Sequence, residues 1–167
     1  MGGDSTQFSA AGIARRVRDG ELSPVEVVDD HLERIRERND RTNAFVTVAA
    51  ESAREAAAEA ERAVEDGEPL APLHGVPVAV KDIDDVAGIE TTHGSRLLED
   101  RIADADTAYV ARLKAAGAIV VGKTNAPEFG YTAITKNLIF GASRNPWDLE
   151  RSPGGSSGGS SAAIAGG

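Results

Sequence analysis

The segment GVPVAVKD, residues 75–82, predicts a short buried strand with a lysine, Lys81, at its carboxyl end. Pro77 has no backbone N–H to donate, so it fits the start or the edge of a sheet better than a strand centre. A second apolar run, AIVV at residues 118–121, predicts another buried strand. Helical patterns alternate with these strands, and this alternation indicates an α/β fold with a largely parallel sheet.

The first clear helix signal is SPVE, residues 23–26, which combines a capping box with proline in the first helical position. Four apolar residues then fall on one helical face: Val25, Val28, Leu32 and Ile35. Residues 43–48, NAFVTV, predict a short strand. An Ala/Glu/Arg-rich helix is expected from about Ala50 to Val64, before Gly67.

Further along the chain, Asp106 is expected to cap a helix that ends at Gly117. Residues 124–153 are rich in Asn, Pro and Gly and predict a long ordered loop. The final stretch SSAAIAGG, residues 160–167, has the pattern of the first turns of a helix. We find no internal repeat and no domain boundary, so residues 1–167 are expected to belong to a single domain.

The composition excludes several classes of protein. The 167 residues are 41% hydrophobic, which indicates a packed core rather than a disordered chain. No apolar run approaches membrane-spanning length, and the start MGGDSTQF lacks the features of a secretory signal. The absence of cysteine rules out disulfides, thiolate metal sites and cysteine nucleophiles, and it fits a cytoplasmic location.

The formal net charge of −9 argues against a nucleic-acid partner, because an acidic surface repels phosphates. We expect no membrane partner either. The chain has only four lysines: Lys81, Lys114, Lys123 and Lys136. An acidic, lysine-poor chain without cysteine is typical of a halophilic protein, in which dense carboxylates hold hydration.

Residues 117–124, GAIVVGKT, satisfy the P-loop pattern around Lys123. A P-loop needs a strand before its first glycine and a helix after its lysine and threonine. Here the predicted strand occupies the middle of the pattern, and Asn-Ala-Pro follows it. A buried strand bounded by glycines is the preferred interpretation, and a P-loop nucleotide binder stays as an alternative.

Residues 154–158, GGSSG, satisfy the G-x-S-x-G pattern of a nucleophile elbow. Such an elbow requires a strand leading into it, with an aspartate and a histidine later in the chain. Residues 151–153, Arg-Ser-Pro, do not have the pattern of a core strand. An α/β-hydrolase elbow is therefore weakly supported.

We expect no metal site. The three histidines, His31, His74 and His93, lack metal-ligand spacing, and there is no cysteine to join them. The acidic stretch KDIDD, residues 81–85, is interpreted as a solvated charged turn.

A lysine at the end of a buried strand can be desolvated, which lowers its pKa toward the range of a general base. A neutral lysine can activate a serine without histidine. Lys81 follows an apolar strand, and Ser156 lies in a Gly-rich turn that lets backbone approach closely. A Ser-Lys site is one interpretation of these residues, and a non-catalytic acidic domain with a flexible Gly/Ser tail is another.

Four segments together resemble the amidase signature family, in that order along the chain: HGVPVAVKD, GIETTHGS, GAIVVGKTNAPEFG and NPWDLERSPGGSSGGSSAAIAGG. The resemblance covers most of the chain. It implies an intracellular hydrolase with a mixed, mostly parallel sheet flanked by helices, which cuts carboxamide C–N bonds without a cofactor. The partner it implies is a small-molecule amide, and a homodimer of the full-length protein is a further expectation.

The catalytic unit of the family is Ser–Ser–Lys. By motif, Lys81 matches the family lysine, and Ser156 matches the bridging serine, which follows a cis peptide bond and here has Gly155 before it. Ser157 resembles a supporting hydrogen-bonding position near the lysine. The resemblance implies a relay in which neutral Lys81 takes a proton from Ser156, and Ser156 takes one from a nucleophilic serine that forms an acyl-enzyme.

In the family the nucleophile lies downstream of the Gly/Ser block, in a turn of its own that does not occur before Gly167. Ser160 and Ser161 are not substitutes, because those positions open a helix in the family. We therefore interpret residues 1–167 as the amino-terminal part of one amidase domain, truncated before the nucleophile, with an incomplete fold and no activity by itself.

The resemblance leaves two branches open. In the A subunit of the tRNA-dependent amidotransferases, the counterpart of GKTNAPEFG usually carries Met-Asp before Glu-Phe. Ala126-Pro127 stands at that place here and favours a stand-alone amidase. The amidotransferase branch stays as the alternative.

Overall fold

The computed structural model describes residues 4–167, and its centre is a three-stranded sheet. The strands are β1 (Phe45–Val48), β2 (Pro77–Lys81) and β3 (Ile119–Thr124), in the order β1-β3-β2. β3 pairs antiparallel with β1 and parallel with β2, so the sheet is mixed. Every residue of β3 is buried, because it is the central strand and both faces of the sheet are covered there. Pro77 begins the edge strand β2, as its missing donor predicts.

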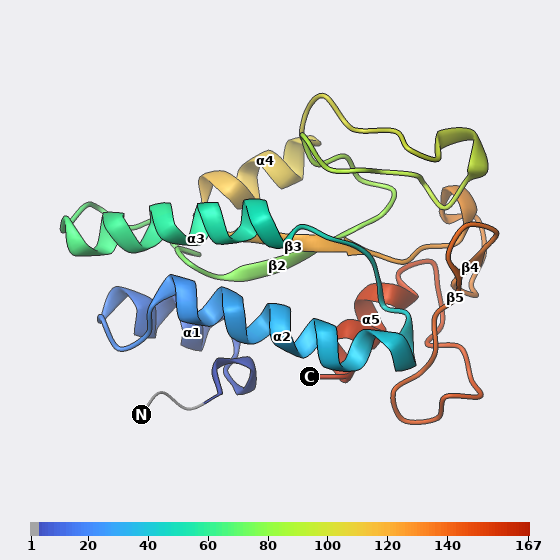
Figure 1. The fold of residues 1–167 in the computed structure, drawn as a ribbon, viewed down its shortest axis with the longest axis horizontal. Helices are drawn as coiled ribbons and strands as arrows, with labels where there is room; N and C mark the ends of the chain where they lie inside the picture. The colour runs from blue at the N-terminus through green and yellow to red at the C-terminus, as the bar shows by residue number, and fades with distance from the viewer. Residues whose placement is uncertain (1–3) are drawn as a thin grey trace.

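The described part of the chain contains five α-helices: α1 (Ala10–Arg18), α2 (Pro24–Thr42), α3 (Ala50–Glu65), α4 (Ala108–Ala115) and α5 (Gly158–Ala165). This part of the chain also contains three short 3-10 turns and a two-stranded ribbon: η1 (Ser5–Gln7), η2 (Arg96–Leu98), η3 (Glu128–Gly130), β4 (Lys136–Asn137) and β5 (Gly141–Ala142). The long helices α2 and α3 run side by side along the sheet (Figure 1). The α/β fold class is therefore confirmed.

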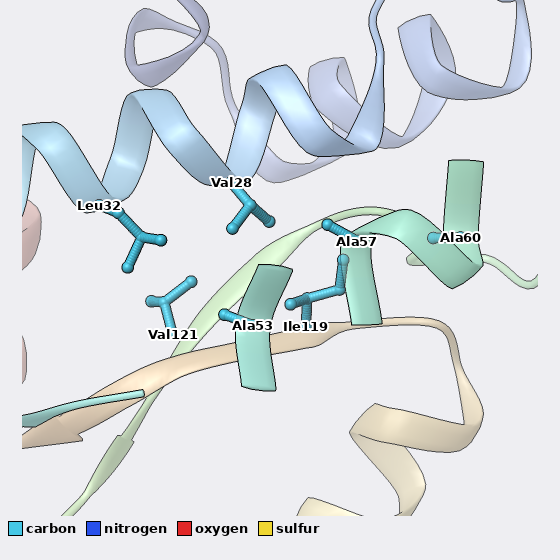
Figure 2. Packing of buried hydrophobic residues seen from close by; sticks show 7 residues of the cluster. All are labelled: Val28, Leu32, Ala53, Ala57, Ala60, Ile119 and Val121. Carbon is cyan, nitrogen blue, oxygen red and sulfur yellow. The ribbon is translucent and has the colours of Figure 1, made fainter. Parts of the chain in front are cut away.

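The main core joins α2 and α3 to the central strand (Figure 2). Its buried members are Val28, Leu32, Ala53, Ala57, Ala60, Ile119 and Val121. The contribution of α3 is entirely alanine, so this helix can approach both α2 and β3 closely. Val120 points to the opposite face of β3, where it packs with Val110 of α4. Both faces of β3 are thus covered. This packing holds β3 in place beside β2, the strand that ends in Lys81.

The first predicted helix begins as its sequence indicates. Ser23 Oγ accepts hydrogen bonds from the backbone N–H groups of Val25 and Glu26, at 3.1 and 3.2 Å. The helix ends at Thr42, and Asn43 follows in a left-handed conformation with φ of 47°. Asn43 therefore closes α2, and β1 begins at Phe45 rather than at Asn43.

Two features of the helices differ from the sequence prediction. Asp106 is not the cap of α4, because the N-cap is Thr107. The Asp106 carboxylate instead accepts from Ala87 N at 2.8 Å and from Lys114 Nζ at 2.7 Å. The sequence interpretation also missed α1, whose cap is Ser9 with its Oγ accepting from Gly12 N.

Candidate active site

The side chains of Lys81 and Ser156 meet beyond the end of β2. Lys81 is the last residue of that strand, and its Nζ donates a hydrogen bond to Ser156 Oγ at 2.7 Å. Both residues are partly buried. Burial lowers the pKa of Lys81, and the negative charge of Asp84 opposes this shift. The structure thus brings together the two residues predicted from the sequence, and burial lowers the pKa of the amine.

Pairing with β3 sets the place of Lys81. In the parallel register Lys81 lies opposite Thr124, at the carboxyl ends of both strands. The chain then turns sharply, with Asp82 N donating to Thr124 O at 2.9 Å and Asp84 N donating to Lys81 O at 3.0 Å. Lys81 therefore projects from a fixed turn at the edge where α/β proteins commonly bind ligands.

A glycine-rich turn places Ser156. The peptide bond between Gly155 and Ser156 is cis, as the family resemblance predicts. A Cβ at Gly155 would lie 2.7 Å from the carbonyl carbon of Ala133 and 2.9 Å from the nitrogen of Ile134. Only glycine fits at residue 155, because the backbone at 133–134 packs directly against the turn.

The other serines of the Gly/Ser block have different partners. Ser157 is exposed at the N-cap of α5, and across residues 4–167 its side chain makes no hydrogen bond, so none joins it to Lys81. Ser160 Oγ lies 2.7 Å from Thr124 Oγ1, and Ser161 Oγ donates to Ser157 O at 3.2 Å. Ser160 and Ser161 both lie within α5, as expected for positions that open a helix.

A family model described as Amidase matches residues 26–167, a range that contains Lys81 and Ser156. The chain belongs to the amidase family. Most of its length takes part in the match, including the whole sheet and α5.

Curated relatives of this amidase-family chain include two proteins that bear the same name. The A subunit of glutamyl-tRNA(Gln) amidotransferase from Salinispora tropica is 50% identical over 162 residues, which cover 97% of this chain and 33% of the relative. The protein of the same name from Streptomyces coelicolor is 45% identical over 162 residues, with the same coverage of 97% and 33%. The chain thus spans about a third of the length of these relatives.

Solved structures show the same fold. A bacterial aryl acylamidase of the amidase signature family has a TM-score of 0.87 and 38% identity, covering 91% of this chain and 32% of that one. 6-Aminohexanoate cyclic dimer hydrolase has a TM-score of 0.87 and 36% identity, covering 99% of this chain and 33% of that one. These likenesses confirm the amidase-signature fold for this chain.

The second lysine that follows an apolar strand, Lys123, is held inside this amidase-family fold. Its side chain is fully buried, and its Nζ donates to Asp84 O at 2.8 Å and to Thr91 Oγ1 at 2.7 Å. The carboxylate of Asp82 lies 3.6 Å away. Burial lowers the pKa of Lys123, and the Asp82 charge opposes that shift. Lys123 thus has a complete set of internal partners.

The two competing motifs do not have the local structure that their chemistry needs. β3 runs through the middle of residues 117–124 as far as Thr124, so the strand occupies the place of a phosphate-binding loop. Residues 151–153 form no strand, so none leads directly into the G-x-S-x-G pattern at 154–158.

The prediction of a solvated charged turn at residues 81–85 is wrong for Asp82. This side chain is 1% exposed, and it accepts hydrogen bonds from Thr92 N at 3.2 Å and Thr92 Oγ1 at 2.6 Å. Asp85, farther along, is held by Arg101 through two bonds of 2.7 and 2.8 Å, which keep the pKa of Asp85 below its usual range. Asp82 was missed because its partners are distant in sequence. The available signal was the threonine pair in GIETTHGS.

The histidines lie apart from one another. His31 Nδ1 lies 2.7 Å from Val27 O, and His74 Nε2 lies 2.8 Å from Ala60 O. His93 Nε2 is 3.9 Å from an oxygen of Asp85. Across residues 4–167, no three His, Asp or Glu side chains gather as a metal site would need. Within the same range, no helix combines the length and apolar character needed to cross a membrane.

Proposed function

We propose that the full-length protein cleaves carboxamide C–N bonds through a Ser-Ser-Lys relay that includes Lys81 and Ser156. The observation that carries this proposal is the 2.7 Å contact between Lys81 Nζ and Ser156 Oγ. A lysine normally holds its proton at neutral pH, but burial lowers the pKa of Lys81. A neutral amine has the lone pair that a general base needs.

In the proposed reaction, a nucleophilic serine outside residues 1–167 attacks the carbonyl carbon of the amide. Its hydroxyl proton passes to Ser156, whose own proton passes to Lys81. The relay then returns a proton to the leaving nitrogen as the C–N bond breaks, and an acyl-enzyme remains. Water attacks the acyl carbonyl and loses its proton along the same route, which releases a carboxylic acid and restores the serine. Backbone N–H groups would stabilise each oxyanion.

Gly155 and Ser157 support this relay in the proposal. Because Gly155 has no side chain, the backbone of Ala133 and Ile134 packs directly against the turn, and this contact holds Ser156 in place. Ser157 is exposed beside Ser156, so a supporting bond near Lys81 requires its side chain to turn from the orientation seen here. Ser157→Ala is therefore expected to cost much less activity than Ser156→Ala.

Two finer assignments are compatible with this reaction, and one of them is the A subunit of a tRNA-dependent amidotransferase. The curated relatives favour it, since proteins 45% and 50% identical to this chain bear that name. Ala126-Pro127 favoured a stand-alone amidase, and two enzymes whose names describe amide hydrolysis are 38% and 36% identical. Identity of 45–50% over 162 residues is stronger evidence than the two residues Ala126 and Pro127. We therefore rank the amidotransferase A subunit first among the finer assignments. Both candidates share the cleavage of an amide C–N bond.

The two candidates imply different partners. A stand-alone amidase would act on a small-molecule amide as a monomer or homodimer. A member of the amidotransferase branch would work beside other protein chains and pass its ammonia to an acceptor. We propose a cytoplasmic location for either one.

The test uses the full-length protein, purified with any protein chains that accompany it, and a panel of free glutamine, a short primary amide and an anilide. We expect release of ammonia or amine by the wild type and loss of this release in Ser156→Ala. Glutamine cleavage by a complex of several different chains supports the amidotransferase, and anilide cleavage by the protein alone supports a stand-alone amidase. Absence of cleavage across the panel contradicts the proposed function.

A further inference from the structure

The turn that carries Ser156 is held at both ends by one buried side chain, that of Thr135. Thr135 Oγ1 donates to Gly154 O at 2.8 Å and accepts from Gly158 N at 3.0 Å. The backbone N–H of Thr135 donates to the same Gly154 oxygen at 3.1 Å. A single residue therefore closes the segment 154–158 around the serine.

Thr135 is itself tied to the end of the central strand. It is fully buried. Two residues later, Asn137 Nδ2 donates at 2.8 Å to the side-chain oxygen of Asn125, which directly follows β3. The strand β3 also pairs with β2, which ends in Lys81. Lys81 and Ser156 are thus both positioned from the same end of β3, Lys81 through strand pairing and Ser156 through Thr135.

We propose that Thr135 is a positioning residue for Ser156, whose hydroxyl keeps the 154–158 turn where Ser156 Oγ reaches Lys81. This inference rests on the proposed Ser-Ser-Lys relay. Thr135 takes no proton in that relay, because its hydroxyl is engaged with Gly154 and Gly158. Its effect on the reaction is geometric.

Loss of the Thr135 hydroxyl has a defined consequence. Gly158 N loses its acceptor at the start of α5, and Gly154 O keeps its bonds from the Thr135 backbone at 3.1 Å and from Ser152 Oγ at 3.4 Å. The turn between them can then shift. A displacement of about 1 Å at a reacting group can cost about 100-fold in rate.

The test compares Thr135→Val with Thr135→Ser in the full-length protein. Valine keeps the branched shape without the hydroxyl, whereas serine keeps the hydroxyl. Thr42→Val is the matched control, because Thr42 is also buried and, within residues 4–167, its hydroxyl bonds only to Arg38 O of its own helix, at 3.4 Å. We expect Thr135→Val to lower kcat about 100-fold with KM nearly unchanged, since the relay acts in the chemical step. Thr135→Ser and Thr42→Val should stay close to the wild type.

A second readout does not depend on activity. Crystal structures of the same variants give the distance between Lys81 Nζ and Ser156 Oγ, which is 2.7 Å here. We expect this distance to be kept in Thr135→Ser and to exceed about 3.2 Å in Thr135→Val. If Thr135→Val does not fold, Thr135→Ala takes its place in both measurements.

The outcomes separate the two proposals. An unchanged kcat or an unchanged Lys81–Ser156 distance in the variant without the hydroxyl overturns the role of Thr135. If the wild type cleaves no amide, the proposed function fails, and the distance alone then decides whether Thr135 positions Ser156.

Discussion

Lys123 and Asp82 face each other in the protein interior, with Nζ 3.6 Å from Oδ1 and both side chains removed from solvent. Lys81, one residue before Asp82, is partly exposed and directs its amine to Ser156. The two lysines that follow apolar strands therefore differ in burial and in hydrogen-bond partners. Lys123 has a carboxylate and a carbonyl nearby that favour its ammonium form, whereas Lys81 has a serine hydroxyl that can exchange a proton with it.

This difference predicts that Lys81→Met in the full-length protein abolishes amide hydrolysis while the fold is kept. Methionine fills similar space but has no lone pair that can act as a base, so the general-base contribution of about 10²–10⁴ in rate is lost. The measurement is product release at saturating substrate, together with circular dichroism. Lys123→Met should cost far less hydrolysis per folded molecule. An equal or larger loss at Lys123 would mean that the base is assigned to the wrong strand.

The free energy of unfolding should show the reverse order, with the larger loss in Lys123→Met and the smaller in Lys81→Met. Lys123→Met leaves the buried Asp82 carboxylate without its cation, and removal of one partner of a buried pair costs about 3–5 kcal/mol. Lys114→Met is the matched control, because the Lys114–Asp106 pair lies at the surface and such pairs contribute about 1 kcal/mol or less. Denaturant unfolding of both variants checks this prediction. Equal free energies of unfolding would contradict a structural role for Lys123.

The pH dependence of hydrolysis should report Lys81. Burial lowers the pKa of Lys81, so activity should rise with pH around a midpoint below the ordinary lysine value of about 10.4. The Asp84 charge opposes this shift. Asp84→Asn removes a charge that stabilises the ammonium form, so the rise should move to lower pH. A pH–rate profile of kcat/KM tests both statements, and a shift to higher pH in Asp84→Asn would contradict them.

Local patterns predicted the positions of Lys81 and Ser156, because each lies at a recognisable boundary. Lys81 ends an apolar strand, and Ser156 lies in a glycine-rich turn. Their contact depends on longer-range packing, in which residues 133–135 close against the turn and β3 aligns β2. No local periodicity records this packing, so Thr135 could not be found from the sequence alone.

The wrong predictions for Asp106 and Asp82 have a similar cause. Asp106 looked like a helix cap, but its carboxylate bonds to Ala87, which is brought close by tertiary structure. Asp82 looked solvated, but Lys123 and Thr92 surround it from other parts of the chain. A charged side chain can lie in solvent or be buried beside partners. Which of the two occurs depends on residues that are distant in the sequence.

The bridging role proposed for Ser156 gives a further prediction. Ser156→Ala in the full-length protein should slow acylation by about 10²–10⁴. The fold should be kept, since the hydroxyl bonds only to Lys81 within the described residues. Pre-steady-state acylation and thermal unfolding measure the two effects, with Ser157→Ala as the neighbouring control. A full-length structure with Ser156 facing solvent, away from Lys81, would contradict the assignment.

The last prediction concerns the two serines nearest to the end of the described chain. Ser160 Oγ is engaged with Thr124 Oγ1 at 2.7 Å, and Ser161 Oγ donates to Ser157 O at 3.2 Å. Neither hydroxyl has Lys81 or Ser156 as a hydrogen-bond partner within residues 4–167. We therefore expect Ser160→Ala and Ser161→Ala to leave most of the hydrolysis of the full-length protein, and residues 1–167 alone to show none.

Steady-state assays of these two variants beside Ser156→Ala, together with an assay of the isolated residues 1–167, check this prediction. The isolated chain should be inactive because the proposed nucleophile lies elsewhere in the full-length protein. Turnover by the isolated chain that disappears in Ser160→Ala or Ser161→Ala would instead place the nucleophile in α5. It would replace the three-residue relay with one in which Lys81 and a serine of the Gly/Ser block act without a downstream residue.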